Sequence, residues 1–243
     1  MSKTPNVTSS PPGERRGTPM RAPRRDEIAA HTVEVISLGP SYKADLLLVD
    51  LGEGPMVVKD FGNKPWWSRF GGIFQTFQED RAYRWLGPLP CVPAFIGKID
   101  SIALAVERVE GQLLARAPDR YENRRVYLHR LRAIMDQFRE LGFFHLDIRG
   151  YKNVMVRPDG ELVALDLEGS FWVRPGSLLA RLLDPWSLRI YKKALLKWKR
   201  ILTTGRPYDV RRSRLRATIQ RLRMPHRWFL NREERRRRDS SDT

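Results

Sequence analysis

The sequence predicts an α+β protein of two lobes, in which an N-terminal five-stranded antiparallel sheet with one helix precedes a mainly helical C-terminal lobe. Two observations carry this prediction. Short β-like runs separated by turn residues fill most of positions 31–111, whereas the longer amphipathic helical patterns lie in the second half of the chain. With 243 residues, 41% of them hydrophobic, the chain has enough apolar material for two small lobes.

The first 27 residues predict a disordered leader. They are rich in Ser, Thr, Pro, Gly and Arg and nearly lack large apolar side chains, so they cannot bury enough surface to offset the entropy of ordering. No secretory signal and no uncharged apolar run of transmembrane length is visible. The single cysteine, Cys91, excludes an internal disulfide. We therefore expect a cytoplasmic protein, either free or peripheral on the cytoplasmic face of a membrane.

Three antiparallel strands joined by hairpins are predicted after the leader. The runs HTVEVISL, DLLLVDL and PMVVKDF have strand character, and residues 39–41 and 52–55 supply the turns between them. The economical arrangement is a three-stranded meander that opens the N-terminal lobe.

One helix and two further strands complete this lobe, which we assign to residues 28–110. A Trp/Gly-rich loop is expected over residues 63–72, and a helix over residues 73–86. The run FIGKIDSIALAVERVEG predicts two strands and a connecting segment. The apolar positions of the expected helix are Ile73, Phe77, Tyr83 and Leu86.

The C-terminal lobe is assigned to residues 111–205 and begins with a helix from about residue 122 to residue 141. Gly142 ends this helix. A loop follows, and then the strands NVMV and LVALDL form a hairpin around the turn at residues 158–160. The apolar face expected for the helix consists of Val126, Leu128, Leu131, Ile134, Met135, Phe138 and Leu141.

The residues around this hairpin carry the most chemical information. Asp147 lies in the loop, Asn153 precedes the first strand, and Asp166 ends the second strand. Phosphoryl transfer needs a carboxylate that accepts a proton from the attacking hydroxyl, and oxygen ligands for the metal that neutralises the phosphates. Asp147 fits the first role, and Asn153 with Asp166 fits the second. The pattern is suited to phosphoryl transfer with the help of Mg²⁺ or Mn²⁺.

The order of His145, Asp147, Asn153, hairpin and Asp166 resembles the catalytic loop and metal motif of the protein-kinase-like superfamily. The resemblance spans about residues 31–172 and implies a two-lobed protein-kinase-like fold. The compact form and short C-terminal part look most similar to small bacterial lipopolysaccharide-core (Kdo/heptose) kinases and related bacterial Ser/Thr kinase-like proteins.

The resemblance also implies a nucleotide site in the N-terminal lobe. Lys59, at the end of the run VVK, would contact the ATP phosphates, and Glu79 on the following helix would be its ion-pair partner. The run AVERVEG looks like the hinge whose backbone holds the adenine. The further nucleotide contacts that the resemblance implies are Gly39 and Ser41 in the first hairpin and Glu107 and Val109 in the hinge.

The sequence departs from the kinase pattern in three places. The interval between Asp147 and Asn153 is one residue longer than in the usual catalytic loop, and Asp166 is followed by Leu–Glu rather than Phe–Gly. The first hairpin offers one glycine and one serine where a Gly-rich phosphate loop would stand. A catalytically inactive kinase-like protein is therefore an open alternative, in which Lys59 would be an ordinary strand-end lysine.

Other residues near the motif could have structural or solvent-exposed roles instead of functional ones. Asp80 competes with Glu79 for the ion pair, and either could belong to a solvated face. His145 is expected to be structural, with its ring hydrogen-bonded to backbone near the metal motif. Glu168 could be a metal ligand or a surface residue, and Arg149 could contact phosphate or only solvent.

Positive charge is concentrated late in the chain. The formal net charge is +17, and from residue 174 to residue 243 there are about 21 Lys and Arg against 6 Asp and Glu. The segment PWSLRIYKKALLKWKRIL reads as a basic amphipathic helix that either covers the C-terminal lobe or touches a membrane. The basic extension at residues 206–243, with Trp228 and Phe229, suggests contact with an anionic membrane surface. Nucleic acid is an unlikely partner because no nucleic-acid-reading motif accompanies the charge.

Together these features predict an ATP-dependent phosphotransferase that phosphorylates a hydroxyl on a sugar or lipid-linked glycan. A protein Ser/Thr kinase is the alternative within the same class. The alternative from another class is an inactive kinase-like scaffold that binds a membrane or another polyanion.

Overall fold

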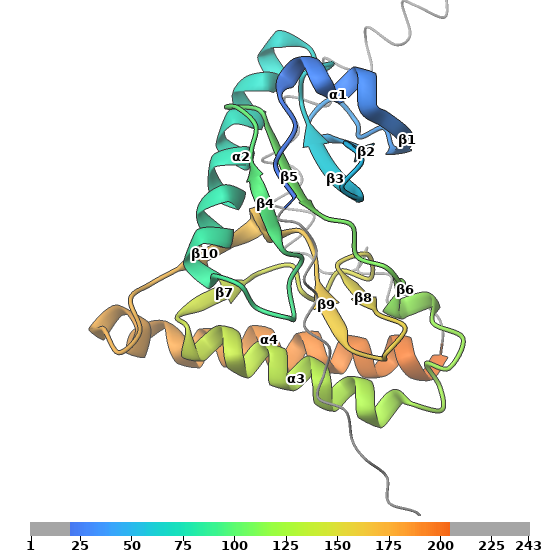
Figure 1. Cartoon of the computed structure of the whole chain (residues 1–243). Coiled ribbons are helices and arrows are strands. Elements are labelled where there is room, and N and C mark those ends of the chain that lie inside the picture. The colour runs from blue at the N-terminus through green and yellow to red at the C-terminus, as the bar shows by residue number, and fades with distance from the viewer. Residues whose placement is uncertain (1–19, 205–243) are drawn as a thin grey trace, which may run out of the picture.

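The computed structural model describes residues 20–204 as an α+β structure (Figure 1). Those residues form four α-helices, a five-stranded antiparallel sheet and two smaller sheets. The elements before residue 110 form the upper part of the molecule in Figure 1, and those after it form the lower part. The first 19 residues of the expected leader and the basic extension at residues 206–243 lie outside the described residues.

The N-terminal sheet contains the five predicted strands in the order β1-β2-β3-β5-β4, with every neighbouring pair antiparallel. Because successive side chains of a strand point to opposite faces, Met56 and Val58 lie on one face of β3, and Val57 and Lys59 on the other. The strands are β1 (Thr32–Ser37), β2 (Asp45–Asp50), β3 (Pro55–Asp60), β4 (Phe95–Lys98) and β5 (Ala103–Glu107).

A short helix, α1 (Arg25–His31), covers one face of this sheet, so the prediction of a disordered leader was wrong for residues 20–27. Ile28 is buried, and the Arg25 guanidinium pairs with the Asp60 carboxylate at 2.6 Å. The average composition of the first 27 residues gave no sign of these contacts. The sheet residues buried with Ile28 are Leu47, Val49, Met56, Val58 and Ala105.

The long helix α2 (Trp66–Leu86) starts before the predicted position, so the loop expected over residues 63–72 was wrong from Trp66 onward. The Pro65 carbonyl accepts the first hydrogen bonds of the helix. Gly72, which made a helix look unfavourable here, allows a close approach, because a Cβ at this position would lie 2.5 Å from the Phe61 ring.

The side chains of α2 do not follow the predicted amphipathic face. Tyr83 and Leu86 are buried as expected, but Ile73 and Phe77 are exposed, so the prediction was wrong for these two residues. Many inward positions are small or polar instead, and Glu79 is one of them. The helix therefore packs on the sheet through close backbone approach and polar contacts as well as apolar side chains.

The C-terminal part contains the predicted hairpin, in which Val154 pairs with Ala164 and β6 adds a third strand. A second, two-stranded sheet pairs β10 with β7. The elements are β6 (Gln112–Leu113), η1 (Leu114–Arg116), α3 (Arg124–Glu140), β7 (Phe143–His145), β8 (Val154–Val156), β9 (Leu162–Ala164), η2 (Leu167–Gly169), β10 (Ser170–Trp172) and α4 (Leu178–Thr204).

Helices α3 and α4 lie side by side and form the base of this part (Figure 1). On α3, Tyr127 is buried in place of the expected Val126, and Gly142 ends the helix with a φ of 64°. On α4, Tyr191 and Trp198 are buried in the core, so the apolar face of this basic helix covers the C-terminal part, which was one of the two alternatives. Of the helices described, none has the length and apolar character to cross a membrane.

The contact between α1 and the sheet yields a stability prediction. Ile28→Ala is expected to lower the free energy of unfolding by about 2–4 kcal/mol, because it leaves a cavity among buried side chains. Val33→Ala, at an exposed position of β1, is the matched control and should change stability by less than about 0.5 kcal/mol. Urea unfolding measures both. Equal stabilities of the two variants would contradict the packing of α1 on the sheet.

Candidate active site

A buried ion pair joins the N-terminal sheet to α2. The Nζ atom of Lys59, on β3, lies 2.6 Å from Oε1 of Glu79, on α2. The neighbouring Asp80 instead accepts a hydrogen bond from Arg84 at 2.8 Å. The structure therefore selects Glu79 over Asp80 as the partner of Lys59.

Asp166 comes to the same lysine from the C-terminal part. Its Oδ1 atom lies 3.9 Å from Nζ of Lys59. Asp166 has a φ of 62°, and within residues 20–204 it is the one non-glycine residue with a positive φ. A left-handed aspartate costs conformational energy and persists where surrounding structure holds it, often at functional sites. This strained backbone turns the Asp166 carboxylate toward Lys59.

The charges around Lys59 favour a further cation. Burial acts to lower the pKa of Lys59, but the carboxylates of Glu79 and Asp166 outweigh it and raise that pKa above its ordinary value. Burial and the nearby Asp166 raise the pKa of Glu168. Three carboxyl groups thus share two lysines, Lys59 and Lys43. An additional cation would relieve the repulsion among the carboxylates.

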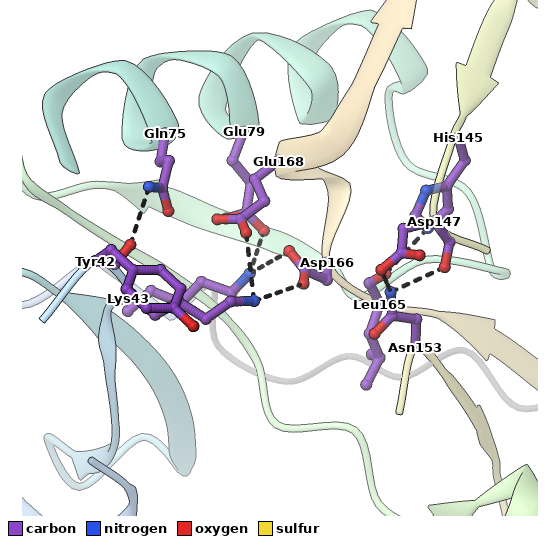
Figure 2. Close-up of polar contacts among 11 residues, drawn as sticks. Tyr42, Lys43, Gln75, Glu79, His145, Asp147, Asn153, Leu165, Asp166 and Glu168 are labelled. Atoms are coloured by element: carbon purple, nitrogen blue, oxygen red, sulfur yellow. Dashed lines mark hydrogen bonds and ion pairs between the residues drawn. The ribbon is translucent and has the colours of Figure 1, made fainter. Parts of the chain in front are cut away.

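The second lysine belongs to the loop between β1 and β2. Nζ of Lys43 lies 3.7 Å from Oε1 of Glu168 and 4.0 Å from Oδ2 of Asp166 (Figure 2). The Tyr42 carbonyl, one residue earlier, accepts a hydrogen bond from Gln75 on α2 at 3.2 Å. This loop therefore lies against α2 and directs Lys43 to the carboxylates.

A buried pair fixes the start of the same loop, where Gly39 and Ser41 were expected to contact phosphate. Nζ of Lys64 lies 2.5 Å from Oδ1 of Asp45 and donates to the Gly39 carbonyl at 2.6 Å. The Gly39 N–H donates to the same aspartate at 3.0 Å, and the Ser41 carbonyl accepts a hydrogen bond from Ser68. These polar groups of Gly39 and Ser41 thus hold the loop itself.

Asp147 and Asn153 contact each other despite the extra residue between them. Nδ2 of Asn153 donates to the backbone carbonyl of Asp147 at 2.9 Å and to its carboxylate at 3.0 Å (Figure 2). Two consecutive turns absorb the longer interval, from the Gly150 N–H to the Asp147 carbonyl and from the Asn153 N–H to the Gly150 carbonyl. A Cβ at Gly150 would lie 2.8 Å from the amide nitrogen of Asn153, so a larger residue here would displace the Asn153 side chain.

His145 has the structural contact that the sequence indicated. Its ring is fully buried, and Nε2 lies 3.1 Å from the carbonyl of Leu165, one residue before Asp166. Burial lowers the pKa of His145, so the ring is neutral and Nε2 carries the proton donated to that carbonyl. The other ring nitrogen, Nδ1, finds no hydrogen-bond partner among the described residues. His145 therefore positions the strand that presents Asp166.

Helix α4 contacts the loop that contains Asp147. The indole N–H of Trp198 donates to the carbonyl of Ile148, next to Asp147, at 2.9 Å. About two helical turns earlier, the Tyr191 hydroxyl accepts a hydrogen bond from the backbone N–H of His145 at 3.4 Å. Both side chains are buried, so the basic helix contributes two polar contacts to the loop as well as apolar cover.

The expected hinge connects the two parts of the molecule. Glu107 ends β5, its carboxylate pairs with Arg157 of the C-terminal part at 2.9 Å, and Val109 lies half-buried in the connection. The Glu107 N–H donates to the Ala94 carbonyl at 2.8 Å, so this donor is already used within the protein. Gly111 has a φ of 134° and lets β6 approach β8. The adenine contact at Val109 stays a prediction.

The remaining question is whether these residues suit a metal. Within residues 20–204, no group of three or more His, Cys, Asp or Glu is arranged to hold a metal ion by itself. Mg²⁺ does not require one, since it often binds one or two carboxylates together with substrate phosphates. Because the amide nitrogen of Asn153 donates to Asp147, its amide oxygen is the atom left to face a cation. Asn153 and Asp166 thus offer the hard oxygen ligands that Mg²⁺ and Mn²⁺ prefer.

Sequence reasoning missed three contributors to this site. Lys43 was not singled out, although it is the lysine of the first hairpin. No local sequence pattern indicates the pair of Lys64 and Asp45, because Asp45 precedes β3 in the sequence and Lys64 follows it. Trp198 lies in the segment predicted as a basic amphipathic helix, and its indole N–H was the available sign of a buried hydrogen bond.

Comparison with protein-family models finds no match to this chain, and comparison with curated proteins finds none either.

The neutral state of His145 makes stability depend on pH. Below about pH 6.5 an unfolded histidine takes up a proton, whereas burial lowers the pKa of His145 in the folded state. The unfolded state then binds more protons, so this histidine makes the free energy of unfolding fall as pH falls, by up to about 1.4 kcal/mol per pH unit. His145→Gln, which keeps a donor for the Leu165 carbonyl, should flatten that dependence.

Urea unfolding between about pH 7 and pH 5 measures this effect. His129→Gln, which removes an exposed imidazole, controls for the loss of a histidine as such. The interpretation of His145 fails if the His145→Gln protein shows the same loss of stability on acidification as the unchanged chain.

Proposed function

We propose that this chain is an ATP-dependent phosphotransferase of protein-kinase-like fold that phosphorylates a hydroxyl on a sugar or lipid-linked glycan. One observation carries the proposal: β3, α2 and the segment after β9 bring Lys59, Glu79 and Asp166 into a single cluster. These segments are far apart in the sequence, and the resemblance to kinases predicted the ion pair of Lys59 with Glu79.

The proposed roles follow from charge and position. Lys59 is held charged by Glu79 and would bind the ATP phosphates, while Asp166 and the amide oxygen of Asn153 would hold Mg²⁺ or Mn²⁺. When bound, the metal would neutralise charge on the phosphates. Glu79 orients Lys59 and does not contact the nucleotide in this scheme.

Asp147 is the proposed general base. Its carboxylate is exposed, and Asn153 fixes it through the side-chain amide. It would accept the proton of the acceptor hydroxyl as that oxygen forms a bond to the γ-phosphorus and the bond from phosphorus to the ADP oxygen breaks. An exposed carboxylate leaves room for a large acceptor such as a glycan.

The acceptor class rests on the likeness to bacterial lipopolysaccharide-core kinases, and a protein Ser/Thr kinase is the alternative. The proposed setting is the cytoplasmic face of a membrane. The basic extension at residues 206–243 was expected to bind an anionic membrane surface, and this stays a prediction outside the described residues.

An inactive scaffold is the competing function, and one observation favours it. Lys43 and Lys59 both lie near Asp166, where the proposed metal would bind. Turnover of ATP therefore decides between the two.

Purified full-length protein is expected to turn over ATP with Mg²⁺ or Mn²⁺, and substitution in the cluster should abolish this. Lys59→Met, Asp147→Asn and Asp166→Asn should each lower kcat/KM by at least about a hundredfold, because each removes a charge that acts on phosphate, proton or metal. ADP release and mass spectrometry of glycolipid, sugar and protein acceptors provide the readout.

Glu79→Gln has a matched control in the next residue. It should lower kcat/KM because it removes the carboxylate that holds Lys59, whereas Asp80→Asn should leave turnover unchanged, since Asp80 pairs with Arg84. Circular dichroism shows whether each variant is folded. Absence of ATP turnover by the unchanged, folded protein on every acceptor class would favour the scaffold, and unchanged turnover by folded Asp166→Asn would refute the catalytic assignment.

The position of Lys43 gives a prediction for metal binding without nucleotide. Lys43→Ala should bind Mn²⁺ severalfold more tightly than the unchanged chain, because a competing cation near Asp166 and Glu168 is removed. Lys43→Arg retains the charge and serves as the control, and Asp166→Asn should weaken binding. Electron paramagnetic resonance of free Mn²⁺ measures the affinities. Equal affinity of the Lys43→Ala protein would mean that Lys43 does not compete for this site.

A further inference from the structure

An exposed apolar stripe runs along the outward face of α2. It consists of Trp66, Phe70, Ile73, Phe74 and Phe77, whose spacing places them on one side of a helix. Three of these side chains are mostly in solvent, with exposed fractions of 74% for Trp66, 66% for Phe70 and 64% for Phe74. Figure 1 shows α2 standing along the edge of the molecule beside the sheet.

This arrangement reverses the usual pattern of a surface helix. A helix that covers a sheet normally turns its large apolar side chains inward, but near its start α2 turns Ser68, Gly72 and Thr76 inward. Leaving several aromatic side chains in water is unfavourable for a protein that has no further contact to make. A contiguous apolar face of this kind marks an interaction surface.

The charges beside the stripe identify the kind of surface that it fits. The two acidic residues of α2, Glu79 and Asp80, are buried, so the exposed charged residues of the helix are all arginines. The guanidinium of Arg69 donates to the backbone carbonyls of Gly62 and Lys64, and that of Arg81 lies 5.5 Å from the centroid of the Phe77 ring. The face thus combines aromatic side chains with positive charge.

We propose that the outward face of α2 docks on a membrane that contains anionic lipids. Trp66, Phe70 and Phe74 enter the boundary between headgroups and acyl chains, and Arg69 and Arg81 pair with lipid phosphates. Charge argues against a second copy of this chain or its own basic extension as the occupant, since either would bring positive charge against the arginines.

The docked helix would also bring the candidate site close to the lipid. Glu79 lies on the inward side of the same helix, and a helix is about 10–12 Å across with its side chains. If the proposed function holds, a lipid-linked acceptor would therefore be delivered at the membrane surface. The docking itself does not depend on that function, because it is measured without nucleotide or acceptor.

Vesicle binding by the full chain tests the proposal. Vesicles of phosphatidylcholine mixed with phosphatidylglycerol are compared with vesicles of phosphatidylcholine alone, at low salt and at high salt. The double variant Phe70→Ser, Phe74→Ser should partition into the anionic vesicles about tenfold or more weakly than the unchanged chain. High salt screens the basic extension, so the difference between the two proteins should persist there.

The matched control changes exposed apolar side chains on a different element. Val33→Ser with Leu38→Ser alters residues with exposed fractions of 67% and 74% near β1 and should leave vesicle binding unchanged. A fluorescent label on Phe74→Cys should report an apolar environment on anionic vesicles, and the same label on Leu38→Cys should not. Cys91→Ala removes the native thiol in both labelled proteins.

Three results would overturn the proposal. The first is equal vesicle binding by the Phe70→Ser, Phe74→Ser protein at both salt concentrations. The second is a dimer in sedimentation velocity that this variant abolishes, which assigns the stripe to self-association. The third is a label at residue 74 that reports an apolar environment without vesicles and loses it when residues 205–243 are deleted, which assigns the stripe to the extension. Loss of docking with ATP turnover intact would leave the proposed function standing.

Discussion

The buried ion pair between Lys59 and Glu79 is the constraint on which the rest of the structure depends. Removing two charges from water costs free energy, and breaking such a pair by deleting one partner typically costs about 3–5 kcal/mol. The pair therefore fixes the distance between β3 and α2, at 2.6 Å between the charged atoms. The small inward residues of α2, with Gly72 against Phe61, allow the helix to come that close to the sheet. Close packing and charge pairing thus require each other.

In the C-terminal part, two buried side chains hold the backbone next to Asp147 and Asp166. His145 bonds the carbonyl before Asp166, and Trp198 bonds the carbonyl after Asp147. Each contact uses a buried ring nitrogen to hold a main-chain atom, and each would leave an unsatisfied buried group if removed. The strained backbone of Asp166 is held within this frame.

Local sequence patterns predicted the five strands of the N-terminal sheet, the hairpin of β8 and β9 and both helices of the C-terminal part, but not β6, β7 or β10. They failed where distant residues decide the outcome. Gly71 and Gly72 argued against a helix, but Phe61 needs the space that a glycine leaves. Apolar spacing put Ile73 and Phe77 inside, but the interior of α2 is set by Glu79 reaching Lys59. Pairs such as Lys64 with Asp45 depend on sheet geometry and have no local pattern.

The hydrogen bond from Trp198 to Ile148 has a consequence for biosynthesis. Trp198 lies about 50 residues after the loop that it holds. Until that stretch is translated, the nascent chain contains the residues of the sheet and of the loop around Asp147 but lacks the indole that holds the loop. Translation must therefore proceed past α4 before the loop around Asp147 reaches its final geometry. A polypeptide released before Trp198 is made would lack the side chain that holds this loop.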